Sequence, residues 1–148
     1  MKDYSIIAVE NFKKGYNCAQ AVFMTFSSEL GLDENTSLKL SSSFGGGMGR
    51  LREVCGAVTA MFAIAGLKCG YTSCNDDEIK AKHYELIQNL ANEFKSEHNS
   101  IICRELLGLD IEADSPVPSA RTKEYYDNLP CEFYIKKAAE LIQTNFFS

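Results

Sequence analysis

The sequence predicts an all-α protein, a single compact bundle of five to seven helices around a buried central helix. Apolar residues recur at helical spacing along the chain, whereas the alternation typical of strands is nearly absent. With 148 residues, the chain is long enough for one core but not for several domains. We therefore expect residues 1–148 to form one helical domain.

The first part of the chain is expected to form three helices, each placed by its start and stop signals. Asp3 can cap the first helix, which Gly15 ends. Asn17 can cap a second helix, which runs from Cys18 to Leu30. A third, short helix follows Asp33 and leads to a run of glycines.

The rest of the chain contains the predicted central helix, from about Glu53 to Lys68. That helix is hydrophobic nearly all round, so its neighbours should surround it. A long helix should start at Asp76 and run to about Glu97, Ser100 can cap a short one, and Pro130 begins the last. The segment from Asp110 to Thr122 contains two prolines and is typical of a surface loop, a candidate lid or interaction segment.

Composition and charge exclude several classes of protein. A chain with 45% hydrophobic and 24% charged residues is too apolar for intrinsic disorder. A net charge of −5 argues against binding to nucleic acid or to an anionic membrane surface. The longest apolar run, Val54 to Leu67, is shorter than the roughly 20 residues of a membrane-spanning helix. Because the start of the chain lacks the pattern of a secretory signal, we expect a cytoplasmic protein.

Six cysteines are the outstanding feature of the composition. In a reducing compartment they are metal ligands, redox-active thiols or small buried hydrophobes rather than a disulfide framework. Four of them lie near predicted helix starts and on apolar faces, so their sulfurs can converge. Helix N-termini favour thiolates, which predicts lowered pKa values for these four thiols. They are Cys18, Cys55, Cys103 and Cys131.

The cysteine spacing excludes several familiar sites. No Cys-x-x-Cys pair is present, which argues against a thioredoxin motif, a zinc ribbon or a ferredoxin cluster. A site assembled from distant helices remains open. The alternative for any single cysteine is that it only fills space in the core. Cys69 and Cys74 are interpreted as incidental thiols, although they lie close enough in sequence to form a second pair.

Two further features are candidates for binding. Backbone N–H groups of the glycine-rich loop can form an anion or cofactor nest, with Arg52 adding charge. A tight connection between two helices explains the same glycines, and no nucleotide-binding motif is present. His83 can act as a base or a metal ligand, but we favour a core histidine with one hydrogen bond. The loop residues assigned to cofactor binding are Gly45, Gly46, Gly47 and Arg50.

The order of these motifs resembles the C_GCAxxG_C_C family of proteins proposed to be redox-active. The resemblance rests on GYNCAQ at 15–20, FGGGMGR at 44–50, CGA at 55–57 and the isolated Cys103 and Cys131. It spans about Asp3 to Ile142 and implies a small helical protein with four characteristic cysteines, the same four chosen above. It also implies an association with a transporter or oxidoreductase system, because members tend to be encoded near such genes. Ala60 departs from the pattern, which has a second glycine there.

Three functions follow from these observations. The first is thiol/disulfide electron transfer with a redox partner protein or small molecule, in which Cys18 pairs with Cys55 and Cys103 with Cys131. The alternative is a module in which these four thiols bind a metal ion or an iron–sulfur cluster; otherwise no cofactor is needed. The third is a helical scaffold, and small residues on the central helix are compatible with a homodimer.

Overall fold

The computed structural model describes residues 2–148 and has an all-α fold, which confirms the predicted class. Within this range six helices contain nine or more residues, in agreement with the expected five to seven. A short 3-10 turn, η1 (Ser28–Leu30), continues α2. The helices are α1 (Tyr4–Lys13), α2 (Cys18–Ser27), α3 (Glu34–Ser42), α5 (Gly56–Cys69), α6 (Asp77–His98), α7 (Cys103–Leu106), α8 (Lys123–Asn128) and α9 (Cys131–Phe146).

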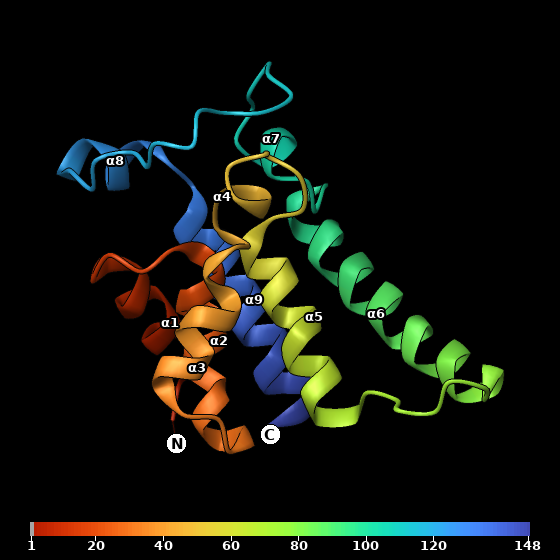
Figure 1. The fold of residues 1–148 in the computed structure, drawn as a ribbon. Helices are drawn as coiled ribbons and strands as arrows, with labels where there is room; N and C mark the ends of the chain where they lie inside the picture. Colours follow the sequence, from red (N-terminus) through yellow and green to blue (C-terminus); the bar gives the residue numbers. More distant parts are fainter. Residues whose placement is uncertain (1) are drawn as a thin grey trace.

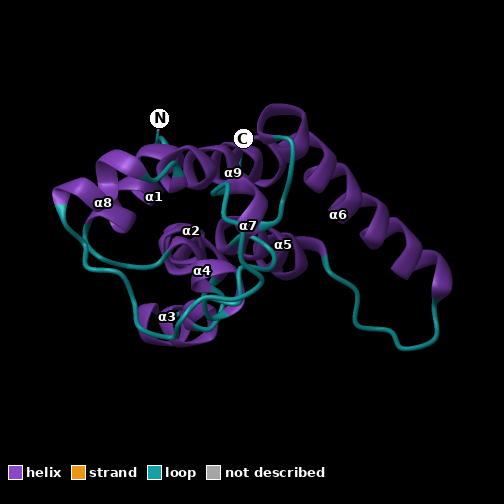
Figure 2. Cartoon of the chain, turned by 90° about the horizontal axis from the view of Figure 1, so that it is seen from above, coloured by secondary structure: helices purple, strands orange, loops and turns teal. Residues whose placement is uncertain are grey.

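The bundle is built in layers around α5, the helix expected at the centre. Viewed from above, α1 and α9 lie side by side over α2 and α5, and α3 covers the other side of α2 (Figure 2). Val58, Met61 and Ile64 of α5 are fully buried between α2 and α9. The nearly uniform hydrophobicity of α5 follows from this position, because neighbours cover most of its circumference.

Side-chain caps start the helices where the sequence predicts. Asn17 Oδ1 accepts from the Gln20 N–H at 2.8 Å, and Gln20 in turn accepts from the Asn17 N–H, which completes a capping box. Asp3, Asp33 and Asp76 likewise accept from backbone N–H groups in the first turns of α1, α3 and α6. These three predicted starts are confirmed to within one residue.

The central helix begins three residues later than predicted because the chain before it pairs with a distant segment. Val54 and Ile102 form an isolated antiparallel bridge, and the Cys55 N–H donates to Ile101 O at 2.8 Å. Successive side chains of two paired extended segments point to alternate faces. Cys55 and Cys103 therefore lie on the same face of this pairing. This contact brings the start of α5 to the start of α7.

The label α4 (Gly45–Met48) covers a turn rather than a regular helix, because Gly46 and Gly47 have left-handed φ values of 67° and 68°. The predicted loop at 110–122 is present, but α8 follows it and was not predicted; Thr122 caps this helix.

The first half of α6 and the preceding loop extend away from the bundle (Figure 1). Both termini lie at the end of the bundle opposite α4 and α7 (Figure 1). Among the described residues, no helix is both long and apolar enough to cross a membrane.

Candidate functional site

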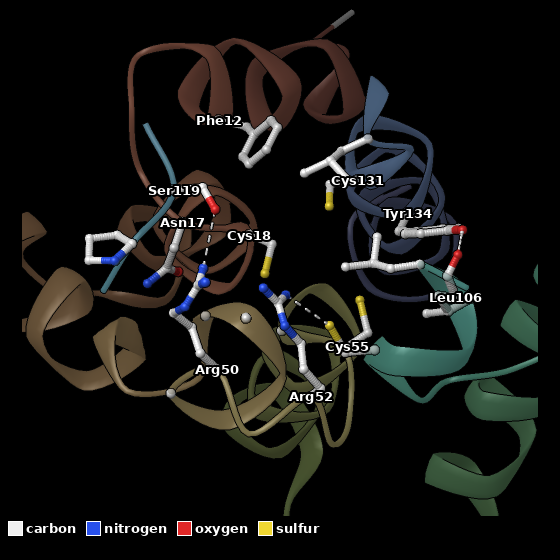
Figure 3. A pocket seen from close by; sticks show the side chains of 18 of the residues that line it. Phe12, Asn17, Cys18, Arg50, Arg52, Cys55, Leu106, Ser119, Cys131 and Tyr134 are labelled. Atoms are coloured by element: carbon white, nitrogen blue, oxygen red, sulfur yellow. Dashed lines mark hydrogen bonds between the residues drawn. The ribbon is translucent and has the colours of Figure 1, made fainter. Parts of the chain in front are cut away.

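A cavity of about 300 Å³ lies at the end of the bundle where α2, α5, α7 and α9 begin. All four cysteines singled out in the sequence line it. Figure 3 shows the sulfurs of Cys18, Cys55 and Cys131 directed into the same space. The structure thus brings together four thiols from widely separated parts of the chain, as their positions on the apolar faces predict.

Each of these cysteines lies at a helix start. Cys18, Cys103 and Cys131 are the first residues of α2, α7 and α9, and Cys55 is the residue before the first turn of α5. Asn17 and Gln20 fix the start of α2, and the pairing of residues 53–55 with 101–103 fixes those of α5 and α7. The expected placement at helix N-termini is therefore confirmed for all four.

The prediction of lowered thiol pKa values is wrong for three of them. Burial raises the pKa of Cys18, raises that of Cys55 well above its ordinary value, and raises that of Cys131 to about 12. Backbone N–H groups of Gly46, Ala19 and Gly56 lower the pKa of Cys18, but loss of hydration has the larger effect. A helix start stabilises a thiolate less than an apolar enclosure destabilises it. These three thiols are therefore protonated at neutral pH.

Cys103 has a different surrounding, because a cation touches its sulfur. Arg52 Nη1 donates to Cys103 Sγ at 3.5 Å, and the contact is drawn as a dashed line in Figure 3. Arg52 is only 9% exposed, and its Nη2 donates to Asp114 Oδ2 at 3.0 Å. A guanidinium against a sulfur stabilises negative charge on that sulfur. Cys103 is thus the thiol of the four with a directly bonded cationic partner.

Three arginines, and no acidic residue of the described chain, are among the residues that line the cavity. Arg50, Arg52 and Arg121 contribute three of the four arginines in a chain of net charge −5. Arg121 donates to Phe12 O at 3.1 Å and to Tyr16 O at 3.0 Å. Its guanidinium also lies 4.5 Å from the centre of the Phe12 ring. The chain therefore concentrates its arginines around the thiols.

Glycines next to the thiols are required by close approach. A Cβ on Gly56 would lie 2.5 Å from Cys18 Sγ, and one on Gly47 would lie 2.5 Å from the Cys103 Cβ. Gly45, Gly46 and Arg50, which the sequence assigns to cofactor binding, line the cavity. Gly47, also in that set, does not line the cavity and lies against the Cys103 side chain. The glycine-rich segment is thus a tight connection, as the alternative interpretation holds, and it also forms one wall of the cavity.

The segment from Asp114 to Arg121, which we call the strap, covers one side of the cavity. Arg50 Nε donates to Ser115 O at 2.6 Å, and Arg50 Nη2 lies 3.2 Å from the Asp114 carboxylate. Pro116, Pro118 and Ser119 of the strap line the cavity. The Arg52 hydrogen bond holds the pKa of Asp114 below its ordinary value, so this carboxylate stays charged at neutral pH. The strap, which belongs to the segment predicted as a candidate lid, is therefore held in place by arginines that line the site.

Three other candidates lie away from the cavity. Cys69, the last residue of α5, and Cys74, in the loop after it, are exposed, and neither lines the cavity. His83 is on α6, in edge contact with the Tyr71 ring. The expectation of a core histidine with one hydrogen bond is wrong, because His83 is half-buried and its Nδ1 has no partner among the described residues.

Sequence reasoning missed several residues that shape the cavity. Phe12 and Arg121 come from the first helix and the strap, and only their contact in the fold relates them. Tyr134 lies one turn after Cys131, and its hydroxyl donates to Leu106 O at 2.7 Å, which ties α9 to α7. The spacing of Tyr134 from Cys131 on one helix is the signal that was available for it.

A metal site needs several donor side chains directed at one point. Over residues 2–148, no three side chains among His, Cys, Asp and Glu are placed to hold a metal ion together. The four thiols are the right donors for zinc or an iron–sulfur cluster, but their arrangement here does not form a ligand set.

One comparison with known proteins agrees with the motifs seen in the sequence. No curated protein and no solved structure matches the chain. The family model described as "Putative redox-active protein (C_GCAxxG_C_C)" matches residues 16–145. This range contains all four cysteines of the cavity and confirms the resemblance seen in the sequence. The chain belongs to the C_GCAxxG_C_C family.

Proposed function

We propose that this protein transfers electrons by thiol–disulfide exchange at the four-cysteine cavity. The observation that carries the proposal is the convergence of four thiols, one of them against a buried guanidinium, on one small cavity. The redox activity that the family description names supports it. A cytoplasmic location is part of the proposal, because a reducing compartment returns such thiols to their reduced form.

Cys103 is the attacking thiol in this proposal. Disulfides are attacked by sulfur that carries negative charge, and the Arg52 guanidinium, which donates to Cys103 Sγ, can stabilise that charge during the attack. Negative charge on Cys103 is one cause of the raised pKa values of Cys18 and Cys131. The three neighbouring thiols stay protonated at neutral pH, and only Cys103 of the four has a guanidinium bonded to its sulfur, which sets an order of reaction among them.

Cys18 is the resolving thiol. Charge on Cys18 contributes to the raised pKa values of Cys55 and Cys131, and charge on Cys103 raises that of Cys18 itself. The sulfur of Cys18 is thus within electrostatic reach of each of the other three. We pair Cys18 with Cys103 rather than with Cys55, because Cys103, which has the guanidinium contact, is the attacking thiol. Cys55 and Cys131 form the second, less reactive pair.

Mild oxidation of the purified protein followed by mass spectrometry tests this function. The reduced chain should lose two hydrogens per disulfide formed, and peptide mapping should find Cys18 joined to Cys103 first. Cys103→Ala should abolish that first step, whereas Cys69→Ala, which removes an exposed thiol at the far end of α5, should leave it unchanged. Six thiols that stay reduced, or that react no faster than free cysteine, would refute the proposal. Mass spectra recorded before oxidation report any bound metal.

A further inference from the structure

We propose that the cavity selects small disulfides that carry a carboxylate, with Arg50 and Arg52 holding the carboxylate beside the thiols. This inference rests on the proposed function, since it names the substrate class of the same site. It depends on three observations: the distribution of charge, an unpartnered atom of Arg52, and the size of the enclosure.

The charge of the cavity does not follow from the charge of the chain. The protein has 20 acidic residues and a net charge of −5, yet the described cavity lining holds three arginines and no carboxylate. No lysine of the described chain lines the cavity either. Asp114 contacts Arg50 and Arg52 from the strap and offsets one of the charges. A net positive site next to thiols recognises an anion.

Arg52 has hydrogen-bonding capacity that the protein leaves unused. Its Nε is buried and has no partner among the described residues, although Arg52 as a whole is 9% exposed. Burying an unpaired donor of a charged group is costly, so such a group calls for an acceptor from outside the chain: a water molecule, an anion or a ligand. In Figure 3 the Arg52 side chain projects into the cavity between Cys18 and Cys55. A carboxylate there would accept from Arg52 within reach of the sulfurs.

The enclosure sets the size of the ligand. A cavity of about 300 Å³, covered by the strap, is at the small end of the range for ligand sites. It suits a disulfide of amino-acid size rather than a protein surface loop. The Asp114 carboxylate lies 3.2 Å from Arg50 Nη2 and 3.0 Å from Arg52 Nη2. A ligand carboxylate would therefore compete with Asp114 for these guanidinium groups.

The reaction balances with the ligand as oxidant. The Cys103 thiolate attacks one sulfur of R–S–S–R, a bond forms between Cys103 Sγ and that sulfur, the ligand S–S bond breaks, and R–S⁻ leaves. Cys18 loses its proton to the departing thiolate and attacks Cys103 Sγ, which forms the Cys18–Cys103 disulfide and releases the second R–S⁻. Protonation of that thiolate uses the proton that Cys103 lost. The ligand gains two electrons and two protons, and the two cysteines lose them.

Three disulfides of similar size and different charge test the selectivity. They are 3,3′-dithiodipropionate, which is anionic, bis(2-hydroxyethyl) disulfide, which is neutral, and cystamine, which is cationic. Reduced protein is mixed with each, and the rate of Cys18–Cys103 formation is followed by mass spectrometry after acid quenching. The anionic compound should react about tenfold faster than the neutral one, with cystamine the slowest. Equal rates would overturn the inference.

Two variants localise the effect. Arg50→Gln should reduce the ratio of the anionic to the neutral rate toward one, because it removes a charge that lines the cavity. Lys39→Gln removes the same charge from an exposed position on α3 and should leave that ratio unchanged. A ratio that falls equally in both variants would show an effect of overall charge and would contradict a site at Arg50.

Suberate separates the inference from the function on which it rests. This dicarboxylate has two methylenes where dithiodipropionate has its sulfurs, so it can bind but cannot react. Titration calorimetry should detect suberate binding to the wild-type protein, and suberate should slow oxidation by dithiodipropionate. Binding of suberate without oxidation by any disulfide would refute the redox function and leave the anion site. Oxidation by all three disulfides at one rate, without suberate binding, would refute the inference and leave the function.

Discussion

Arg52 donates from Nη1 to Cys103 Sγ at 3.5 Å and from Nη2 to Asp114 Oδ2 at 3.0 Å, so one buried guanidinium joins a thiol to the strap. Two separate segments hold the arrangement in place. The Cys103 N–H donates to Glu53 O at 2.6 Å, directly after Arg52, and Asp114 N–H donates to Arg50 O at 2.9 Å. The charge on Arg52 is therefore held against the sulfur by backbone pairing as well as by its own bonds.

Arg52→Gln is expected to slow the alkylation of Cys103 by iodoacetamide at neutral pH by about tenfold, because the guanidinium that donates to Cys103 Sγ no longer stabilises the negative charge of the attacking sulfur. The rate at Cys103 is measured by peptide mapping across a range of pH. Arg50→Gln is the matched control, since it also removes an ion pair with Asp114 but no contact with the sulfur. Equal slowing in both variants would attribute the effect to the strap and not to the sulfur contact.

Gly56→Ala is expected to lower the free energy of unfolding by about 1–3 kcal/mol, because the new methyl overlaps its neighbours. Its Cβ would lie 2.5 Å from Cys18 Sγ and 2.7 Å from Phe44 O. Gly66→Ala in the same helix meets nothing within 4 Å and should raise the free energy of unfolding by about 0.5–1 kcal/mol. Urea denaturation measures both. A Gly56→Ala protein as stable as Gly66→Ala would contradict the close packing of α2 on α5.

The helices could be predicted because their signals are local. Asp3, Asn17 and Asp33 each accept backbone N–H bonds within three residues, and such caps are legible in a sequence. The start of α5 was misplaced because Val54 pairs with Ile102, and no local pattern reports a partner 48 residues away. α8 does have a local cap at Thr122, but its six residues include no buried residue, so no apolar stripe marks it as a helix.

The site was predicted in its cysteines but not in its electrostatics. Apolar faces and helix starts were enough to group all four thiols, Cys103 included. The sign of the pKa shifts of Cys18, Cys55 and Cys131 depends on the depth of burial, which the sequence does not report, and desolvation outweighs the helix termini. Arg121 could not be assigned to the site, because it arrives there through contacts with Phe12.

Raised thiol pKa values predict a loss of stability at alkaline pH. The pKa of Cys131 is about 12 in the fold against a reference value of 9.0, so the unfolded chain releases its proton first as the pH rises. Stability from this thiol is fully present below pH 9 and is lost between pH 9 and 12, by at most about 1.4 kcal/mol per pH unit. Urea denaturation at pH 7.5 and 10.5 measures the loss.

Cys131→Ala provides the comparison for that measurement. It should be less stable than the wild type at pH 7.5, because it leaves a gap in the wall of the cavity, but it should lose less stability on going to pH 10.5. Cys69→Ala, which removes an exposed thiol, should show the wild-type loss. The same alkaline loss in all three proteins would assign it to groups other than Cys131.

Tyr134→Phe is expected to cost about 1 kcal/mol of stability, because Leu106 O loses its partner at 2.7 Å. Hydrogen exchange should increase at the amides of α7, which this bond ties to α9. Tyr84→Phe removes a hydroxyl that is bonded to Tyr71 on the exposed part of α6, and its cost should be near zero. Unchanged exchange in α7 after Tyr134→Phe would show that backbone pairing alone holds Cys103.

Asp114→Asn should loosen the strap, because both arginines lose the carboxylate that they share. Limited proteolysis should cut the strap, which contains Pro116 and Pro118, faster than in the wild type, and neutral alkylating reagents should reach Cys18 sooner. Glu112→Gln, two residues before it and exposed, is the control and should change neither rate. Faster proteolysis in both variants would show that general loop charge, and not the Asp114 contact, restrains the strap.

The separation of the two ends of the bundle has a practical consequence for the whole molecule. The cavity opens where α4 and α7 lie, and both termini lie at the other end (Figure 1). A fluorescent protein, an affinity handle or a further polypeptide can be joined to either terminus without covering the mouth of the cavity. The architecture accordingly permits fusion at both ends, and the redox behaviour of a fused chain should match that of the unfused one.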